Sequence, residues 1–201
     1  MNHSSKKTRK LVEIGMLGAI AAVLMLFEIP IPFIAPPFYE IDLSEVPVLV
    51  GAFALGPLAG ATIELVKILL NLLINGTMTA FMGEFGNYLI GCAFVVPAGL
   101  IYKMHKSKNQ ALLAMLAGTL SMTVLGCLIN AYVLLPTYAA AFGMPLESII
   151  AMGTSINGGI QNVLTFVIFA VAPFNLLKGA IVSLITALIY KRISPILKGS
   201  H

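Results

Sequence analysis

Residues 6–29, KKTRKLVEIGMLGAIAAVLMLFEI, decide the class of fold, because four basic residues precede an apolar run broken only by Glu13 and Glu28. The run matches the roughly 20 residues that a membrane helix needs. A secretory signal peptide has a shorter apolar region of about 7–15 residues and a small-x-small cleavage site, which this segment lacks. The pattern therefore predicts a retained first transmembrane helix over residues 10–29.

The composition extends this reading to the whole chain. Of the 201 residues, 59% are hydrophobic and 10% are charged, whereas soluble domains are about 45–50% apolar and about 25% charged. A short soluble chain cannot bury so much apolar surface, so we expect an integral membrane protein. No G-x-x-x-x-G-K-[ST] motif occurs, so a P-loop ATPase is excluded, and active transport would draw its energy from an ion gradient or another chain.

Proline and glycine divide the remaining apolar sequence into helices. Prolines in the segment 30–42 prevent a continuous helix there, and we expect this segment to be an external loop that acts as a lid. Gly56-Pro57 separates two helices, and Pro173 is expected to kink the last one. The predicted helices are 10–29, 43–56, 58–74, 85–102, 110–135 and 158–192.

Basic residues indicate how these helices cross the membrane. Ten of the twelve fall in three clusters: Lys6, Lys7, Arg9 and Lys10; Lys103, Lys106 and Lys108; Lys191, Arg192 and Lys198. With six spans all three clusters lie on one side, which the positive-inside rule assigns to the cytoplasm. The prediction is an all-α, multi-pass membrane protein with six transmembrane helices and both termini cytoplasmic. Fusing the second and third helices would place the second cluster outside.

The other two lysines, Lys67 and Lys178, fall inside predicted spans. A charge at the bilayer centre costs at least about 2.5–3.5 kcal/mol, so each lysine needs a partner or a polar cavity. Lys67 follows Glu64 by three residues and precedes Asn71 by four, which places all three on one helix face. Either Glu64 and Lys67 form a structural ion pair, or this face lines a polar site with Asn71 as the better ligand.

Lys178 follows Asn175 by three residues, just after Pro173. A proline frees backbone groups of the preceding turn, and irregular backbone at membrane depth is tolerated where it lines a cavity. Asn175 and Lys178 are therefore candidate ligand-binding residues. The alternative is a structural pair between Lys178 and Glu64 or Glu84.

Further polar residues lie towards the external half of the predicted helices. Glu84 and Asn87 begin the fourth helix, Asn130 lies in the fifth, and Tyr39 lies in the first loop. Glu84 could instead be an acid that complements a helix dipole, and Asn130 could bond between helices. The predicted binding set is Tyr39, Asn71, Glu84, Asn87, Asn130, Asn175 and Lys178.

Small residues form one face of the first helix: Gly15, Gly18, Ala19 and Ala22. Such spacing lets helix backbones approach closely. The partner is either another helix of this chain or a second membrane protein.

Catalytic and metal signatures are missing from the sequence. No H-E-x-x-H or G-x-S-x-G motif occurs, and the three histidines lie in the tails or the basic loop. We therefore expect neither an enzyme nor a metal site. The basic loops are explained by topology and by anionic lipid rather than by nucleic acid.

Four segments resemble a known family: 38-FYEIDLSEVPVLVGAFALGPLAGA-61, 76-GTMTAFMGEFGNYLIG-91, 132-YVLLPTYA-139 and 173-PFNLLKG-179. They are similar to the riboflavin-specific S components of energy-coupling factor (ECF) transporters of prokaryotes. The resemblance covers essentially the whole chain, from the first helix to the last basic residues.

The resemblance implies a six-helix subunit of the plasma membrane that captures riboflavin from outside in a pocket closed by the first loop. It also implies a transmembrane coupling protein and two ATPase subunits as partners, with the small-residue face of the first helix contacting the shared partner and the subunit toppling during transport. Asn130, Asn175 and Lys178 match the family's ligand positions. Riboflavin would be the transported ligand, and no cofactor is expected.

The flavin ring is flat and largely apolar with polar edges, so amide and ammonium groups suit it, and Met78, Phe81 and Met82 are expected to pack on it. Two alternatives remain: an S component for a different vitamin, or a self-sufficient secondary transporter. The second is disfavoured because the sequence has no evident pair of internal repeats.

Overall fold

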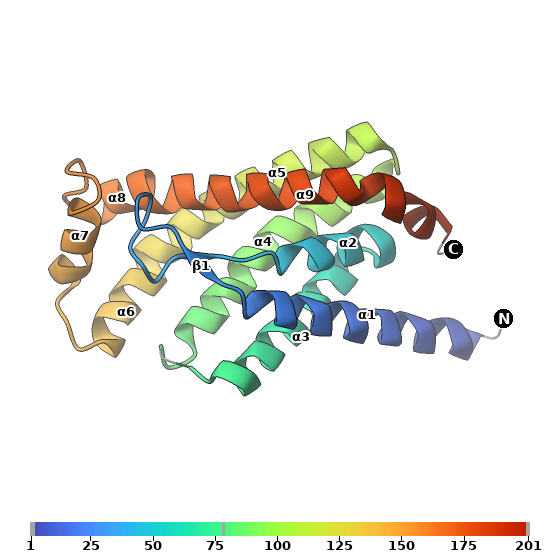
Figure 1. The fold of residues 1–201 in the computed structure, drawn as a ribbon, viewed down its shortest axis with the longest axis horizontal. Coiled ribbons are helices and arrows are strands. Elements are labelled where there is room, and N and C mark those ends of the chain that lie inside the picture. The colour runs from blue at the N-terminus through green and yellow to red at the C-terminus, as the bar shows by residue number, and fades with distance from the viewer. Residues whose placement is uncertain (1–2, 78, 200–201) are drawn as a thin grey trace.

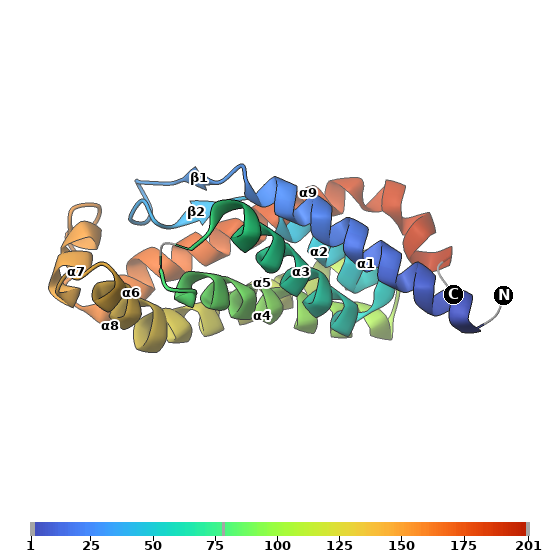
Figure 2. The ribbon, with the colours of Figure 1, turned by 90° about the horizontal axis from the view of Figure 1, so that it is seen from below.

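The computed structural model describes residues 3–77 and 79–199 as an elongated bundle of helices with a short two-stranded hairpin along its side (Figures 1 and 2). The hairpin pairs Ile29 with Ile41 and Pro30 with Glu40 in antiparallel register. The elements are α1 His3–Met25, β1 Ile29–Pro30, β2 Glu40–Ile41, α2 Glu45–Leu55, α3 Pro57–Asn75, α4 Met82–Met104, α5 Lys108–Ile129, η1 Asn130–Leu134, α6 Leu135–Ala141, α7 Leu146–Thr154, α8 Val163–Phe166, η2 Val167–Val171 and α9 Ala172–Gly199.

Four stretches of helix are long and apolar enough to cross a membrane: Pro57–Asn75, Met82–Met104, Lys108–Ala141 and Val163–Ile189. α2 is apolar but has only 11 residues. α1 has 23 residues, but Arg9, Lys10 and Glu13 place charges in its first half, so it is less apolar than the four candidate spans. The described chain is therefore a helical membrane protein with four clear spans and two further helices packed among them.

Two π-helical segments accommodate the prolines within the long helices. η1 ends two residues before Pro136, and η2 ends two residues before Pro173. Proline has no N–H and its ring clashes with the carbonyl four residues earlier, and a wider turn just before it accommodates both effects. The helix predicted to end near residue 135 therefore continues to Ala141, with Pro136 in the first turn of α6.

The last long helix begins later than the sequence pattern predicts. Asn162 is its N-cap, and its side chain accepts a hydrogen bond from the backbone N–H of Thr165 (2.9 Å) while the Thr165 hydroxyl accepts from the backbone of Asn162 (3.0 Å). This reciprocal cap fixes the start at Val163 rather than near residue 158. Residues 158–161 thus belong to the connection that follows α7.

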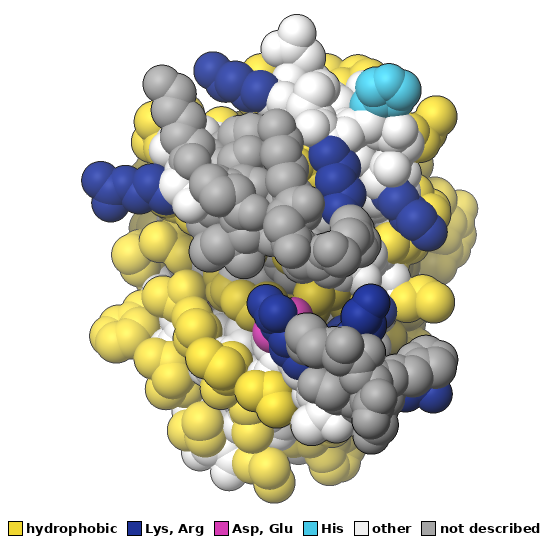
Figure 3. Space-filling view, turned by 90° about the vertical axis from the view of Figure 1, so that its right-hand side faces the viewer, with side chains coloured by type: hydrophobic (Ala, Val, Ile, Leu, Met, Phe, Trp, Pro, Cys, Tyr) yellow, Lys and Arg dark blue, Asp and Glu magenta, His cyan; other side chains and the backbone are white. Residues whose placement is uncertain are grey.

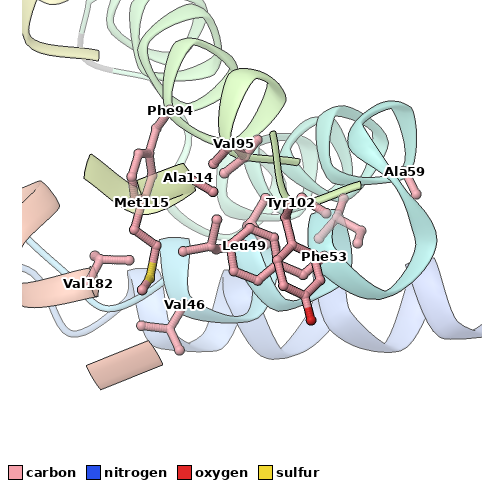
Figure 4. Close-up of a cluster of buried hydrophobic side chains, with 14 of the residues drawn as sticks. Val46, Leu49, Phe53, Ala59, Phe94, Val95, Tyr102, Ala114, Met115 and Val182 are labelled. Atoms are coloured by element: carbon pink, nitrogen blue, oxygen red, sulfur yellow. The ribbon is translucent and has the colours of Figure 1, made fainter. Parts of the chain in front are cut away.

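Two clusters of buried side chains form the core. In the first, Phe53 stacks on Tyr102 with ring centroids 4.3 Å apart, and Leu49, Phe94 and Met115 pack around them (Figure 4). The second lies under the hairpin and includes Ile41, Phe166 and Phe174. These clusters hold the helices on either side of the cavity described below, which takes Met122 from the first and Phe174 from the second.

Basic residues gather at one end of the bundle. Both chain ends lie there (Figure 1), and the view onto that end shows Lys and Arg side chains (dark blue) gathered on it (Figure 3). The first cluster lies at the start of α1, and the second surrounds the connection from α4 to α5. The side chains of Lys191 and Lys198 lie outside those that the structure describes.

The small-residue face of α1 is divided. Gly18 and Ala22 are buried, and a Cβ on Gly18 would lie 2.5 Å from Cγ1 of Val66 on α3. Gly15 and Ala19 are exposed, and a Cβ on Gly15 would meet nothing within 4 Å. Gly18 and Ala22 thus pack inside the chain, and Gly15 and Ala19 face outward.

Leucine at these two glycines should therefore have opposite effects. Gly18→Leu should lower the free energy of unfolding by about 1–3 kcal/mol, because the added side chain overpacks the contact with α3. Gly15→Leu should leave stability nearly unchanged. Denaturant unfolding of both variants in one detergent tests this, and equal losses would contradict the division of the face.

Candidate ligand-binding site

A partly open cavity of ≈ 540 Å³ lies between the first loop and helices α3, α4, α5 and α9. All seven residues of the predicted binding set line it: Tyr39, Asn71, Glu84, Asn87, Asn130, Asn175 and Lys178. They come from the loop and from four different helices. The bundle therefore brings together polar groups that lie up to 139 residues apart along the chain (Tyr39 to Lys178).

Lys178 is held by an acid from the first loop. Its Nζ donates to Oδ2 of Asp42 at 2.9 Å, and Oδ1 of Asp42 accepts the backbone N–H of Ser44 at 2.6 Å. Burial alone would raise the pKa of Asp42. The positive charge of Lys178 and, to a smaller extent, that of Lys67 instead hold this pKa well below its ordinary value. The partner of Lys178 is thus Asp42 and neither Glu64 nor Glu84, because the hairpin returns the loop to the face of α9.

Two asparagines are placed by the π-helical segments. Asn130 is the first residue of η1, and its Nδ2 donates to the carbonyl of Gly126 at 2.8 Å while its Oδ1 accepts the hydroxyl of Tyr39. Asn175 follows η2, and its Nδ2 donates to the carbonyl of Val171 at 3.1 Å. Both amides are anchored to their own helices, so their orientation at the cavity is fixed before any ligand arrives.

Glycine allows α5 and α9 to approach where these amides lie. A Cβ on Gly126 would lie 2.7 Å from Nδ2 of Asn175, and a Cβ on Gly179 would lie 2.5 Å from Cγ2 of Thr119. Real Cβ atoms essentially never come so close. The glycine on each helix therefore makes room for a polar side chain of the other.

Threonines fix the turn that presents Glu84. Oγ1 of Thr77 accepts the N–H of Phe81 at 2.9 Å, and Oγ1 of Thr79 accepts the N–H of Gly83 at 2.9 Å and donates to Glu84 at 3.3 Å. Ala80 and Phe81 have positive φ angles of 49° and 68°, a strained conformation for residues other than glycine. Two side-chain caps thus hold a strained turn at the edge of the cavity.

The aromatic wall of the cavity differs from the one expected from sequence. Phe81 is 59% exposed, and neither it nor Met82 lines the cavity, while Met78 lies outside the described residues. The wall is formed instead by Phe38, Tyr39, Tyr138 and Phe174. The strained turn directs Phe81 outward, and the hairpin carries Phe38 and Tyr39 inward.

A buried ion triad supports the cavity from the side of α2 and α3. Nζ of Lys67 lies 2.8 Å from Oε1 of Glu45 and 2.7 Å from Oε1 of Glu64, and all three side chains are at most 2% exposed. Lys67 itself does not line the cavity, but Glu45 does. This geometry supports the interpretation of Glu64 and Lys67 as a structural ion pair. Glu45 is a second carboxylate partner of Lys67 that the sequence pattern did not reveal.

Of the buried polar atoms that have no hydrogen-bond partner among the described residues, two belong to the cavity wall. These are Oε2 of Glu45 and Nδ2 of Asn71, both on residues that line the cavity. A buried donor or acceptor without a partner costs about 1–3 kcal/mol. One acceptor and one donor are therefore available to a ligand at this wall.

Two further acids in the cavity wall were not in the predicted set: Glu28, just after α1, and Glu40 on β2. Burial raises the pKa of Glu28 to about 7, and its hydrogen bond with Glu40 and the charges of Glu40 and Asp42 add to the effect. The only sequence signal was that Glu28 interrupts the apolar run and Glu40 adjoins Tyr39. The first loop therefore supplies much of the polar wall.

The cavity has the chemistry of a small-molecule site rather than a reaction centre. It combines aromatic faces with amides, an ammonium and carboxylates, the usual form of a specific pocket for a flat, partly apolar ligand. Among the described residues no group of three or more His, Cys, Asp or Glu side chains is placed to hold a metal ion. The fold and the site define a membrane protein that binds a small organic molecule.

Comparisons with known proteins agree with this class. A family model described as "ECF transporter, substrate-specific component" matches residues 9–190. The chain is 33% identical to "Riboflavin transporter FmnP" of Bacillus subtilis, covering 94% of both chains. It is 35% identical to "Riboflavin transporter RibU" of Staphylococcus aureus, covering 96% of this chain and 94% of that one.

A solved structure described as "Structure and mechanism of the S component of a bacterial ECF transporter" matches with a TM-score of 0.74 and 34% identity. The match covers 96% of this chain and 99% of that one. The chain belongs to the family of ECF transporter substrate-specific components.

The buried triad should be a stability element. Lys67→Met leaves two buried carboxylates without their cation, which should lower the free energy of unfolding by about 3–5 kcal/mol. Thermal or denaturant unfolding in detergent measures this, with the exposed Lys108→Met as the matched control. Adding Glu64→Gln to Lys67→Met should restore part of the loss, and an equal effect of the two single variants would contradict the role of the triad.

Proposed function

We propose that this chain is the riboflavin-capturing S component of an ECF importer in a prokaryotic plasma membrane. The observation that carries the proposal is the cavity under the first loop, in which the predicted polar set meets an aromatic wall. The curated relatives named as riboflavin transporters match more than nine-tenths of the chain. Its role is binding and translocation rather than catalysis.

The cavity suits an isoalloxazine. The ring is flat and largely apolar, so Phe38, Tyr138 and Phe174 can pack against it. Its pyrimidine edge carries carbonyl and N–H groups, which need donors and acceptors together. Lys178 supplies donors only, whereas the amides of Asn130 and Asn175 supply both kinds. The acids on the loop side can accept hydrogen bonds from ribityl hydroxyls.

The topology proposed for this function has six membrane-crossing helices. They are α1, α2, α3, α4, α5 continued through α6, and α8 continued through α9. The basic clusters and both termini then face the cytoplasm, and the first loop, residues 30–42, covers the cavity from outside. α2, with 11 residues, is about 16 Å long and crosses only part of the ~30 Å core.

The first loop is proposed to be a lid that opens to admit the ligand. Its closed form is held by the contact of Asp42 with Lys178 and by that of Tyr39 with Asn130. Both contacts join the loop to helices across the cavity. A ligand that bonds Lys178 and Asn130 would engage the same groups that close the lid.

The energy source is proposed to lie on other chains: a transmembrane coupling protein and two ATPase subunits. On α1, Gly15 and Ala19 are the small residues left on the outer face. They are spaced so that a partner helix can approach closely. Gly18 and Ala22 support this contact indirectly by seating α1 on α3.

Capture is tested on the purified chain. It should absorb as a flavin or bind added riboflavin, and in liposomes it should not accumulate riboflavin unless the coupling and ATPase subunits are present. Sustained uptake by the chain alone would instead indicate a secondary transporter. A colourless chain that prefers another vitamin in competition would indicate an S component of different specificity.

Lys178 and its acid should be separable by mutation. Lys178→Ala should weaken riboflavin binding by about 1.5–3 kcal/mol, the value of a hydrogen bond to a charged group. Asp42→Asn should weaken it less, because the ammonium remains but loses its anchor. Riboflavin titration followed by fluorescence measures both, with the exposed Lys10→Ala as control. Unchanged affinity with reduced thermal stability would make Lys178 a purely structural residue.

The outer face of α1 should matter for assembly alone. Gly15→Leu should leave riboflavin affinity unchanged and reduce co-purification with the coupling protein, because the added side chain prevents close helix contact. Leu11→Ala, at an exposed position of the same helix, serves as a control that adds no side-chain volume. Loss of riboflavin binding in Gly15→Leu would contradict this assignment.

A further inference from the structure

A second hollow, open to the surface, lies between α4 and α5 and has a volume of ≈ 400 Å³. We name it the α4–α5 groove: α4 lines it from Leu89 to Leu100, and α5 contributes Ser121 and Leu125. Among the described residues it shares no lining residue with the ligand cavity. Its walls are mostly apolar, and Leu100 and Leu125 at its edges are 54% and 42% exposed. The groove therefore faces the lipid.

The α4 side of the groove continues into a basic end. Its residues follow one another at alternating steps of three and one, so they form a single stripe along an α-helix. Three residues beyond Leu100 the same stripe reaches Lys103, which is exposed. Lys106 and Lys108 follow in the connection to α5 and at its first turn.

The length of the groove matches one leaflet. Leu89 and Leu100 are separated by 11 residues, or about 16 Å along a helix. The hydrocarbon core is ~30 Å thick, so one leaflet is roughly half of that. An apolar groove of this length, ending at exposed lysines, has the dimensions of one acyl chain below its headgroup.

We propose that the α4–α5 groove binds an anionic phospholipid of the leaflet on the basic side, with one acyl chain in the groove and the phosphate at Lys103. We choose a lipid rather than a protein helix as the occupant because the groove lies between two helices and has lysines at one end. This shape and charge complement one acyl chain with an anionic headgroup. Basic residues beside a transmembrane helix attract anionic headgroups. The inference goes beyond flavin capture and does not depend on it.

The chain has no tryptophan, so one introduced tryptophan reports local lipid directly. Leu100→Trp places the probe in the groove. Leu112→Trp is the matched control. Residues 100 and 112 are each six residues from the centre of the α4–α5 connection at residue 106, so both probes lie at a similar depth. Residue 112 lies nine positions before Ser121 and therefore on the opposite side of α5, away from the groove. Each variant is reconstituted in phosphatidylcholine vesicles with a small, equal fraction of brominated phosphatidylglycerol or brominated phosphatidylcholine.

Bromine should quench the tryptophan at position 100 more strongly from phosphatidylglycerol than from phosphatidylcholine, and the tryptophan at 112 should show no such preference. Adding Lys103→Gln should reduce the preference about fivefold, as expected for one basic residue near an anionic surface, and Ala93→Phe should abolish it by filling the groove. Equal quenching at both positions, or a preference unaffected by these two changes, would overturn the proposal.

A second measurement avoids the tryptophan substitutions. Native mass spectrometry of the detergent-purified chain, supplied with phosphatidylglycerol, should show fewer retained lipids for Lys103→Gln than for the exposed Lys10→Gln. Equal retention by these two variants would also overturn the site.

Discussion

A buried ammonium needs a counter-ion, and this constraint organises the ligand end of the molecule. Lys178 lies on a helix among apolar side chains, and its acid, Asp42, is 136 residues away in sequence. Because an unpaired charge at membrane depth is costly, the loop that carries Asp42 must return to α9. That return places Tyr39 beside Asn130 and covers the cavity. The same rule draws α2 onto α3, where Lys67 holds Glu45 and Glu64.

Irregular backbone shapes the cavity wall. Both π-helical segments precede a proline: η1 begins with Asn130, and Asn175 lies four residues after the end of η2, each with its amide bonded to its own helix. Helices that were regular throughout would turn these amides to other faces. The glycines at positions 126 and 179 then let α5 and α9 close on each other. The site thus depends on three kinds of exception to ordinary helix geometry: proline, π turn and close glycine contact.

The chemistry of the bundle changes along its length. The basic clusters and both termini lie at one end (Figure 1), and the acidic loop and the cavity lie away from that end. In the proposed topology the ligand meets acids, amides and aromatic rings on one side of the membrane, and the lysines meet anionic headgroups on the other. The proposed lipid occupies the α4–α5 groove beside the basic end, and the proposed coupling protein contacts the outer face of α1.

The sequence by itself determined the class of protein, its apolar helical stretches and the seven polar residues that line the cavity, because apolar runs, charge clusters and polar groups in lipid are local features of the chain. The tertiary structure alone decided which acid meets Lys178, since the sequence pattern suggested Glu64 or Glu84 and the hairpin brings Asp42 instead. It also decided that Gly18 packs inside while Gly15 faces out, and that Phe38 rather than Phe81 joins the cavity wall. Those outcomes depend on where the first loop returns, on how α1 is rotated against α3 and on one strained turn. A single sequence does not reveal them, because contacts between distant segments produce no periodic pattern along the chain.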